Sequence, residues 1–259
     1  MTEPAWIDLE GVANMRDVGG LPTTDGGTVQ PGRLLRSDNL QDLTAADIDR
    51  LLQQYGVTDV VDLRSNTELR ITGPAPMQAL NDVAHYHFSL FPDDRPADTA
   101  DALVLPWHGR AEQPRDVDPT ASHYLGYLAE RPDSISAALA VLARSAGATV
   151  VHCAAGKDRT GTVVALALTV AGVPRDAVVA DYAASTERVE RIVERLRVLP
   201  GYAENLAGVP MQAHYSRPEV IDRLLDAVAE EAGSVPDWLR SQGWSDEQVT
   251  ALRDKLVTP

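Results

Sequence analysis

The chain has 259 residues, of which 44% are hydrophobic, and its formal net charge is −15 at pH 7. A chain of this length and composition can bury a sizeable core, and we expect one domain over residues 1–259. The negative charge argues against nucleic acid and anionic membrane surfaces as partners. The single cysteine excludes an internal disulfide and a cysteine-rich metal site, and it suits a reducing compartment such as the cytoplasm.

The start of the sequence lacks the basic and apolar segments of an export signal, and no later segment is long and apolar enough to span a bilayer. We therefore expect a cytoplasmic protein without integral membrane association. Export by a route that needs no signal peptide is an alternative that the sequence leaves open.

The first part of the chain predicts an α/β architecture. Residues 7–30 are rich in Gly, Asp and Thr, which predicts a small irregular β layer. We expect a helix that begins at Thr44, with Asp47 as its capping-box partner, and ends at Gly56. The apolar run 57–63 then predicts a buried strand, and a helix that leads into a buried strand is typical of α/β folds.

Polar residues accompany two predicted strands. Asp62 lies at the carboxyl end of the first, where open α/β sheets place ligand sites. It either steadies a neighbouring loop or caps the next turn. The second strand, over 83–90, alternates apolar and polar residues. Its polar face carries His85 and His87, which lack the further ligands of a metal site and fit better as polar residues of a strand face.

Residues 91–120 form a long, acidic, proline-rich stretch without periodicity. A connection of this length in a compact domain is often functional, and we interpret it as a flap on the substrate side. Two helices with apolar stripes are expected after it, over 122–130 and 134–145.

The stretch 150–161 is the most informative part of the chain. Two valines lead into His152 and Cys153, a loop of small residues follows, and an apolar, helix-compatible run continues over 162–170. Successive backbone N–H groups at the opening of a helix make an anion site, and Arg159 adds a planar fork of donors for phosphate oxygens. The same positive field favours the thiolate form of Cys153, so the pattern predicts a nucleophile beneath a bound phosphate.

The remainder of the chain is predicted to be helical. The run 162–170 is apolar on every side, which indicates a central buried helix, and Pro174 suits the first turn of the next one. Four more helices are expected, over 186–199, 218–231, 235–242 and 245–257.

The pattern His152-Cys153-x5-Arg159-Thr160-Gly161 resembles the signature of cysteine-based protein tyrosine phosphatases. A carboxylate inside the loop, at Asp158, is similar to the bacterial triple-specificity group typified by mycobacterial protein tyrosine phosphatase B. The likeness extends over most of the chain, through the segments 14–20, 62–65 and 180–182.

This resemblance implies an α/β fold with a mostly parallel central sheet flanked by helices, a phosphate loop and a helical C-terminal part. It also implies a helical lid over residues 186–212, for which ordinary core packing is the alternative. Arg16 and Arg36 either lie near the active site, as the resemblance suggests, or are structural or solvated arginines.

The resemblance further implies a phosphatase that hydrolyses phosphotyrosine, with phosphoserine and phosphothreonine as further substrates, through a cysteinyl-phosphate and without metal or cofactor. Cys153 is the expected nucleophile, and the general acid is Asp158 or one of the flap residues Asp93 and Asp94. The expected phosphate-binding residues are Ala154, Ala155, Gly156, Lys157, Arg159 and Thr160. The Thr160 hydroxyl is also expected to help the thiolate to leave, and His152 and Asp62 to support the loop.

The interpretation of Lys157 bears on which of two substrate classes is expected. A second cation beside Arg159 resembles the loop of phosphoinositide phosphatases, so a phosphoinositide is an alternative substrate to a phosphorylated protein. Lys157 would instead be a counter-ion if it only balances the charge of Asp158. A non-catalytic phosphate-binding module is a further alternative, although such modules typically lose the nucleophile or the arginine. An arsenate reductase would need more than one cysteine.

Overall fold

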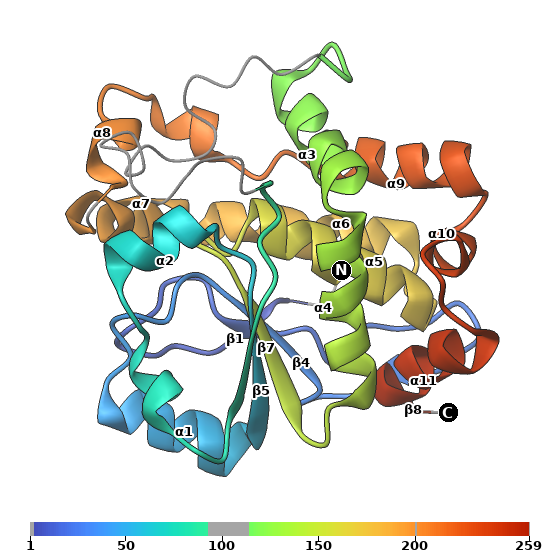
Figure 1. The fold of residues 1–259 in the computed structure, drawn as a ribbon, viewed down its shortest axis with the longest axis horizontal. Helices are drawn as coiled ribbons and strands as arrows, with labels where there is room; N and C mark the ends of the chain where they lie inside the picture. The colour runs from blue at the N-terminus through green and yellow to red at the C-terminus, as the bar shows by residue number, and fades with distance from the viewer. Residues whose placement is uncertain (1–2, 93–113, 200, 259) are drawn as a thin grey trace.

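The computed structural model describes residues 3–92, 114–199 and 201–258. The flap residues Asp93 and Asp94 lie outside these ranges, so their part in acid catalysis stays a prediction. Figure 1 shows a central sheet with helices packed around it, and the C-terminal helices α9, α10 and α11 lie together along one side. Within the described ranges, no helix is long and apolar enough to cross a membrane.

A six-stranded sheet runs through the centre in the order β1-β2-β4-β7-β5-β6. The strands β4, β7, β5 and β6 are parallel, and β1 and β2 add an antiparallel edge, which confirms the expected mostly parallel sheet. A separate antiparallel pair joins β3 (Thr28–Val29) to β8 (Val257–Thr258). The strands of the main sheet are β1 Ala5–Trp6, β2 Arg16–Asp17, β4 Leu34–Ser37, β5 Val57–Asp62, β6 Ala84–His87 and β7 Ala148–His152.

Strand β7 lies in the middle of the sheet, and all of its residues are buried between β4 and β5. His152, its last residue, is in register with Ser37 on β4 and with Asp62 on β5. The three strands therefore end at the same edge of the sheet. Open parallel sheets place their ligand sites outside this edge, so the segment that follows His152 occupies the expected position.

The sheet separates two apolar cores. Val60 and Val150 belong to a smaller core that α1 covers, whereas Val61 and Val151 belong to a larger core built with α3 to α6 and α9 to α11. Successive strand residues point to opposite faces, which explains why apolar runs fill both cores. The helices are α1 Ala45–Tyr55, α3 Pro119–Glu130, α4 Pro132–Arg144, α5 Asp158–Ala171, α6 Arg175–Ala184, α9 Pro218–Ala232, α10 Val235–Ser241 and α11 Asp246–Leu256.

Helix α5 confirms the prediction of a central buried helix, because 12 of its 14 residues are buried. It begins at Asp158, before the apolar run, so Asp158 and Arg159 lie in its first turn. It ends at Gly172, whose φ of +83° is in the left-handed region that glycine adopts without strain. Pro174 directly precedes α6 and is not within its first turn.

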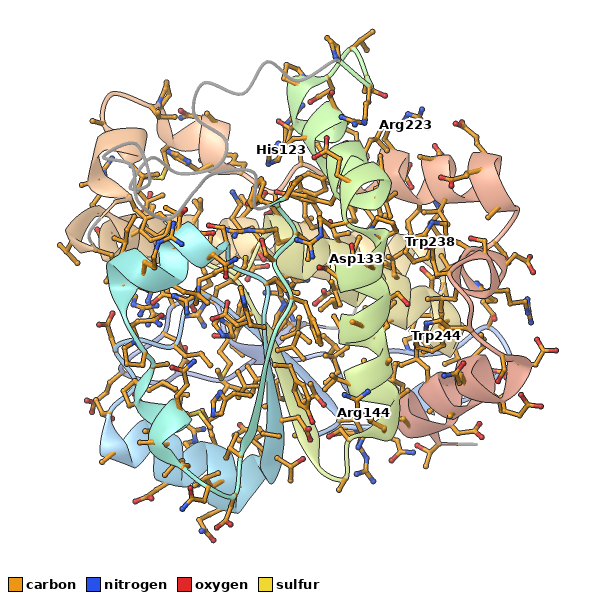
Figure 2. All side chains as sticks on the ribbon, in the orientation of Figure 1. His123, Asp133, Arg144, Arg223, Trp238 and Trp244 are labelled. Carbon is orange, nitrogen blue, oxygen red and sulfur yellow. The ribbon has the colours of Figure 1, made fainter. Side chains whose placement is uncertain are left out.

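Local sequence signals mark the starts of two other predicted helices. Helix α1 begins with a capping box of Thr44 and Asp47 and ends at Gly56, which has a φ of +61°. Helix α11 begins with the same kind of capping box. Between α10 and α11, Trp244 Nε1 donates to Ser136 Oγ on α4 at 2.8 Å, which joins the C-terminal helices to the core (Figure 2).

Two regions differ from expectation. Strand β4 has only four residues, and its polar Arg36 and Ser37 are buried, so it carries no periodic signal. The first residues of the expected helix 186–199 belong instead to a 3-10 turn, η3 (Ser185–Arg188), and the regular helix α7 covers only Val189–Val198. The turn places Ser185 Oγ where it accepts hydrogen bonds from Asn14 and Arg16. The remaining short elements are α2 Asn66–Thr72, η1 Pro76–Ala79, α8 Ala203–Leu206 and η4 Met211–His214.

Candidate active site

The loop 153–157 runs from β7 to α5, and side chains from outside the loop hold its carbonyl groups. The donors, three side-chain groups and one backbone amide, belong to three residues in the N-terminal part of the chain, on β4 and in the segments beside it. The bonds run from Asn39 N and Nδ2 to Ala154 O (3.0 and 3.1 Å), from Asn14 Nδ2 to Ala155 O (3.0 Å) and from Arg36 Nη2 to Gly156 O (2.9 Å).

These bonds determine which way the loop amides face. The C=O and N–H groups of a peptide unit point in opposite directions, so carbonyls held from outside turn the amides toward the inside of the loop. Within the described residues, no backbone amide of 154–157 donates a hydrogen bond. Free amides at the start of α5 form a concave site with positive potential, which is suited to a phosphate group.

Gly156 is required by the close approach of the loop to β4. Its φ is +68°, and a Cβ at this position would lie 2.5 Å from the backbone of Ser37 and of Asp38. Any other residue would both strain this backbone and collide with main-chain atoms that cannot move aside. Gly156 is therefore needed for the shape of the loop.

Cys153 lies at the base of the loop and is 1% exposed. The preceding His152 donates from Nδ1 to the Cys153 carbonyl at 3.2 Å, and its Nε2 lies 3.6 Å from Asp62 Oδ2. Burial lowers the pKa of His152 to about 4, although the charge of Asp62 opposes this shift. A neutral His152 at pH 7 can hold the loop backbone without adding charge to it.

Asp62 reaches the loop indirectly. It accepts hydrogen bonds from the backbone N of Arg64 at 3.0 Å and from its Nε and Nη2 at 2.9 and 2.5 Å. Ser65, and not Asp62, caps the start of helix α2, and Asp62 is bonded to Arg64 instead. Asp62 thus lies beside His152, and its charge is balanced by Arg64.

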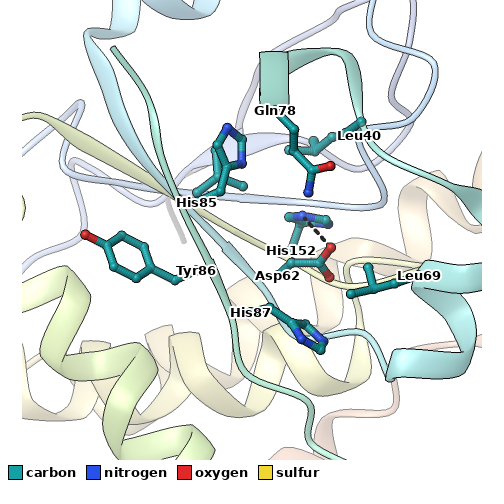
Figure 3. Close-up of a pocket in the computed structure, with 10 residues that line it drawn as sticks. Leu40, Asp62, Leu69, Gln78, His85, Tyr86, His87 and His152 are labelled. Carbon is teal, nitrogen blue, oxygen red and sulfur yellow. Dashed lines mark ion pairs between the residues drawn. The ribbon is translucent and has the colours of Figure 1, made fainter. Parts of the chain in front are cut away.

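A cavity of about 120 Å³ lies beside His152, and histidines of β6 line it (Figure 3). His85 Nε2 lies 3.0 Å from the carbonyl of Met77, and His87 Nε2 lies 2.6 Å from the carbonyl of Arg64. Both rings therefore have backbone partners, as expected for polar residues of a strand face. In the described part of the chain, no three His, Cys, Asp or Glu side chains are grouped so that they could hold a metal ion.

Arg159 is oriented by Glu68, a residue that sequence reasoning missed. The two side chains form a bidentate ion pair, with Nη1 to Oε2 at 2.6 Å and Nη2 to Oε1 at 2.9 Å. Glu68 also accepts from the Tyr202 hydroxyl at 2.7 Å and from the amide of Ser65, which it caps. Burial lowers the pKa of Arg159, but Glu68 and Cys153 raise it by more, so the pKa lies above its usual value and the guanidinium is always charged. The pattern Ser65-x-x-Glu68 was the available signal, although as a capping box it indicates only a helix start.

Asp158 directly follows the loop, in the first turn of α5, and its side chain is 35% exposed. Its Oδ1 accepts a hydrogen bond from Tyr124 at 2.5 Å and lies 4.0 Å from Lys157 Nζ. Burial raises the pKa of Asp158, but the charge of Lys157 and the Tyr124 hydroxyl outweigh it, so the pKa lies below its usual value. The Lys157 ammonium is close enough to balance Asp158, as one of the two interpretations of Lys157 requires.

Thr160 is fully buried, and its Oγ1 has no hydrogen-bond partner among the described residues. Its hydroxyl therefore makes no bond to Cys153 in this structure. Its expected help to the departing thiolate stays a prediction.

A second ion-pair cluster lies beneath the loop. Asp181 on α6 accepts from Arg16 Nε at 2.9 Å and from Arg36 Nη1 at 2.5 Å, and both arginine side chains are fully buried. Arg36 reaches the loop through the carbonyl of Gly156. Arg36 thus lies next to the site and supports its backbone, which combines the two interpretations that the sequence left open.

The segment expected to form a lid packs against the phosphate loop. Ile192 and Leu196 of α7 share a small apolar cluster with Ala154 and Tyr202. Arg195, also on α7, pairs with Asp38, whose carboxylate accepts hydrogen bonds from the amides of residues 13 and 14. The lid itself stays a prediction, because one arrangement does not test movement.

Comparisons with known proteins find both a matching family and similar relatives. A family model described as "Tyrosine phosphatase family" matches residues 7–258. The chain is 30% identical to "Triple specificity protein phosphatase PtpB" of Mycobacterium tuberculosis, over 96% of this chain and 98% of that protein. It is also 30% identical to a putative tyrosine-protein phosphatase of Cupriavidus necator, over 90% of this chain and 82% of that protein.

Proposed function

The chain belongs to the tyrosine phosphatase family, and we propose that it hydrolyses phosphotyrosine by transferring the phosphoryl group to Cys153 and then to water. The observation that carries this proposal is the loop 153–157, whose amides face inward above a buried cysteine at the start of α5. Arg159, aimed by Glu68, supplies the planar donor pair that a phosphoryl group requires.

In the first step the Cys153 thiolate attacks phosphorus, an S–P bond forms, and the P–O bond to the leaving group breaks. The loop amides and Arg159 stabilise the charge on the three equatorial oxygens. Asp158 donates a proton to the leaving oxygen. The pKa of Asp158 lies below its usual value, but a phosphate dianion bound beside it would raise that pKa, because two like charges disfavour ionisation.

In the second step the Asp158 carboxylate accepts a proton from water, whose oxygen attacks phosphorus as the S–P bond breaks. Inorganic phosphate leaves, and Asp158 is protonated again for the next cycle. One carboxyl group serves both steps, as microscopic reversibility allows. The partial exposure of Asp158 and its place directly after the loop, in the first turn of α5, support this assignment over the flap residues.

We further propose a broad substrate range, with phosphoserine, phosphothreonine and phosphoinositides beside phosphotyrosine. The name of the mycobacterial relative includes triple specificity, and Lys157 adds a second cation near Arg159. A non-catalytic binding module is disfavoured because both Cys153 and Arg159 are present in the loop. The lone cysteine suits a reducing compartment and supports a cytoplasmic location.

Release of phosphate from a chromogenic aryl phosphate tests the proposed reaction. We expect turnover that vanadate inhibits and that a metal chelator leaves unchanged. With an activated aryl phosphate, whose leaving group departs fast, rapid mixing should reveal a burst of the aryl product, because hydrolysis of the cysteinyl-phosphate is then the slower step. Absence of turnover by the folded protein would overturn the proposal.

The substrate range is tested by Lys157→Ala. If the ammonium contacts a neighbouring ring phosphate, this variant should lose about tenfold of its phosphoinositide activity and keep its activity on a phosphotyrosine peptide within about threefold. Arg240→Ala, an exposed residue of α10 in the C-terminal part of the chain, is the matched control for the loss of a cation. Equal losses on both substrates would identify Lys157 as a counter-ion of Asp158 and remove the support for the lipid substrate.

A further inference from the structure

Two buried tyrosines from different helices form a series of hydrogen bonds that ends at Asp158. Tyr124 on α3 donates to Asp158 Oδ1 at 2.5 Å, and the hydroxyl of Tyr182 on α6 lies 2.7 Å from that of Tyr124. Both tyrosines are 1% exposed. Neither residue has a part in the two-step reaction described above.

The direction of the series follows from the chemistry of a phenol. A tyrosine hydroxyl has one hydrogen atom, and Tyr124 uses it to donate a hydrogen bond to the Asp158 carboxylate. The Tyr124 oxygen is therefore the acceptor for Tyr182. A hydroxyl that receives a hydrogen bond becomes a stronger donor, so Tyr182 strengthens the bond from Tyr124 to Asp158.

The surroundings hold both rings in place. The rings of Tyr124 and Tyr182 meet edge to face, with centroids 6.1 Å apart and an angle of 88° between their planes. The Tyr182 ring also lies against Gly161 of α5, where an added Cβ would be only 2.7 Å away. Tyr182 directly follows Asp181, which supports Arg36 beneath the loop, so one turn of α6 contacts the site from two sides.

The two oxygens of Asp158 differ in their partners. Tyr124 and Lys157 both approach Oδ1, whereas Oδ2 accepts no hydrogen bond from any residue in the described ranges. The carboxyl group is bonded on one oxygen, and the other oxygen is available to carry the proton that the reaction transfers. A carboxyl group that is partly exposed would otherwise rotate among several orientations.

We propose that Tyr124, supported by Tyr182, is a positioning residue that orients Asp158 so that Oδ2 transfers the proton in the phosphatase reaction. This inference rests on the proposed function of Asp158. Orientation of a proton donor lowers the barrier because less rearrangement is needed at the moment of reaction. The proposal assigns a role to the segment 180–182, which carried part of the family resemblance without a known task in this chain.

The hydrogen bond from Tyr124 also bears on the pH dependence. It favours the ionised form of Asp158, so its removal raises the pKa of that carboxyl group. The groups that face Asp158 are Lys157 and Arg159 from its own segment, His123, Tyr124 and Tyr127 from α3, Tyr182 from α6 and His214 from η4.

The test is a cycle of Tyr124→Phe, Asp158→Asn and the double variant. We expect Tyr124→Phe to lower the kcat/KM for a phosphotyrosine peptide about tenfold, while the kcat/KM for an activated aryl phosphate, whose first step needs no acid, changes less than about twofold. Asp158 must be protonated to act as the acid, and Tyr124→Phe raises its pKa. The alkaline limb of the pH profile of kcat/KM should therefore move to higher pH in this variant. In the Asp158→Asn background, Tyr124→Phe should cause no further loss.

Two other variants complete the cycle. Tyr182→Phe should give a smaller loss with the same leaving-group dependence, because Tyr124 keeps its own bond to Asp158. Tyr55→Phe on α1, far along the chain and packed against the smaller core, is the matched control for a lost phenol hydroxyl and should keep wild-type rates. Thermal unfolding of each variant checks that it is folded. If Tyr124→Phe does not fold, Tyr182→Phe serves as the test in its place.

The proposal is overturned if Tyr124→Phe causes equal losses for both leaving groups and leaves the alkaline limb unmoved. It is also overturned if the losses multiply in the double variant, because Tyr124 would then have a merely structural role. The outcome for Asp158→Asn separates this failure from that of the proposed function. If Asp158→Asn slows only the poor leaving group while Tyr124→Phe is normal, only the positioning role is wrong. If Asp158→Asn itself is normal, the assignment of Asp158 as the acid is wrong.

Discussion

Two ion-pair clusters contact the phosphate loop, and they differ in how their charges balance. Arg159 and Glu68 pair one to one at the side of the loop, whereas Asp181 serves both Arg16 and Arg36 beneath it. The second cluster therefore carries one excess positive charge. Burial and the nearby Arg36 lower the pKa of Arg16 to about 10, which still leaves it charged at neutral pH.

The geometry of the partners explains the two roles. Arg36 directs its donors to Asp181 and to the carbonyl of Gly156, so it holds the backbone and adds positive potential from below. Arg159 lies in the first turn of α5, and its partner Glu68 comes from a different helix that faces the loop. The comparison teaches that a buried arginine beside an anion site is identified by what its donors contact. The following variants distinguish residues that take part in the reaction from residues that stabilise the loop.

The largest effect is expected for Cys153→Ser, which removes the nucleophile and leaves both clusters intact. Turnover of an aryl phosphate should fall by at least about 10⁴-fold, because a serine hydroxyl is a far weaker nucleophile without a base. Binding of a phosphotyrosine peptide, measured by calorimetry, and the thermal midpoint should remain close to those of the wild type. Residual activity within tenfold of the wild type would contradict the role of Cys153.

The next largest effect is expected for Asp181→Asn, which leaves two buried arginines without a carboxylate. Loss of one partner from a buried ion pair costs about 3 kcal/mol of unfolding free energy, which urea denaturation can measure. The matched control is Asp222→Asn, in an exposed pair with Arg175, for which a loss below about 1 kcal/mol is expected. Similar losses in the two variants would show that the cluster beneath the loop is not a source of stability.

A smaller and pH-dependent effect is expected for Glu68→Gln. Burial raises the pKa of Glu68, but Arg159 and its hydrogen bonds lower it more, so the folded-state pKa lies below the ordinary value of 4.5. Its charge therefore stabilises the fold above pH 4.5, and this stabilisation is lost as the pH falls through the folded-state pKa.

At pH 7 the Glu68→Gln variant should lose about 2 kcal/mol of unfolding free energy, as for a hydrogen bond to a charged group. The difference from the wild type should shrink in denaturation series carried below pH 4.5. The kcat/KM for aryl phosphates should also fall, because Arg159 loses its orientation. A difference that is constant from pH 7 to pH 3 would mean that folding does not shift the pKa of Glu68, and that its charge does not stabilise the fold.

Much of the fold could be predicted because its signals are local. The capping box of Thr44 and the left-handed Gly56 mark both ends of α1, and the apolar run 162–170 indicates a buried helix without reference to any other segment. The phosphate loop is also local, since strand, cysteine, glycine and arginine follow one another directly. The short strand β4 has no such signal, because only its place between β2 and β7 makes it a strand.

The sequence by itself determined the α/β class, the course of most helices and the loop 153–159 with its nucleophile and arginine, because each depends on residues close together in the chain. Only the tertiary structure decided what supports that loop. Glu68 lies 91 positions from Arg159, Asp181 lies 145 from Arg36, and Tyr124 lies 34 from Asp158. No local periodicity records such pairs, because they form only when strands and helices pack and bring distant charges and hydroxyls into contact.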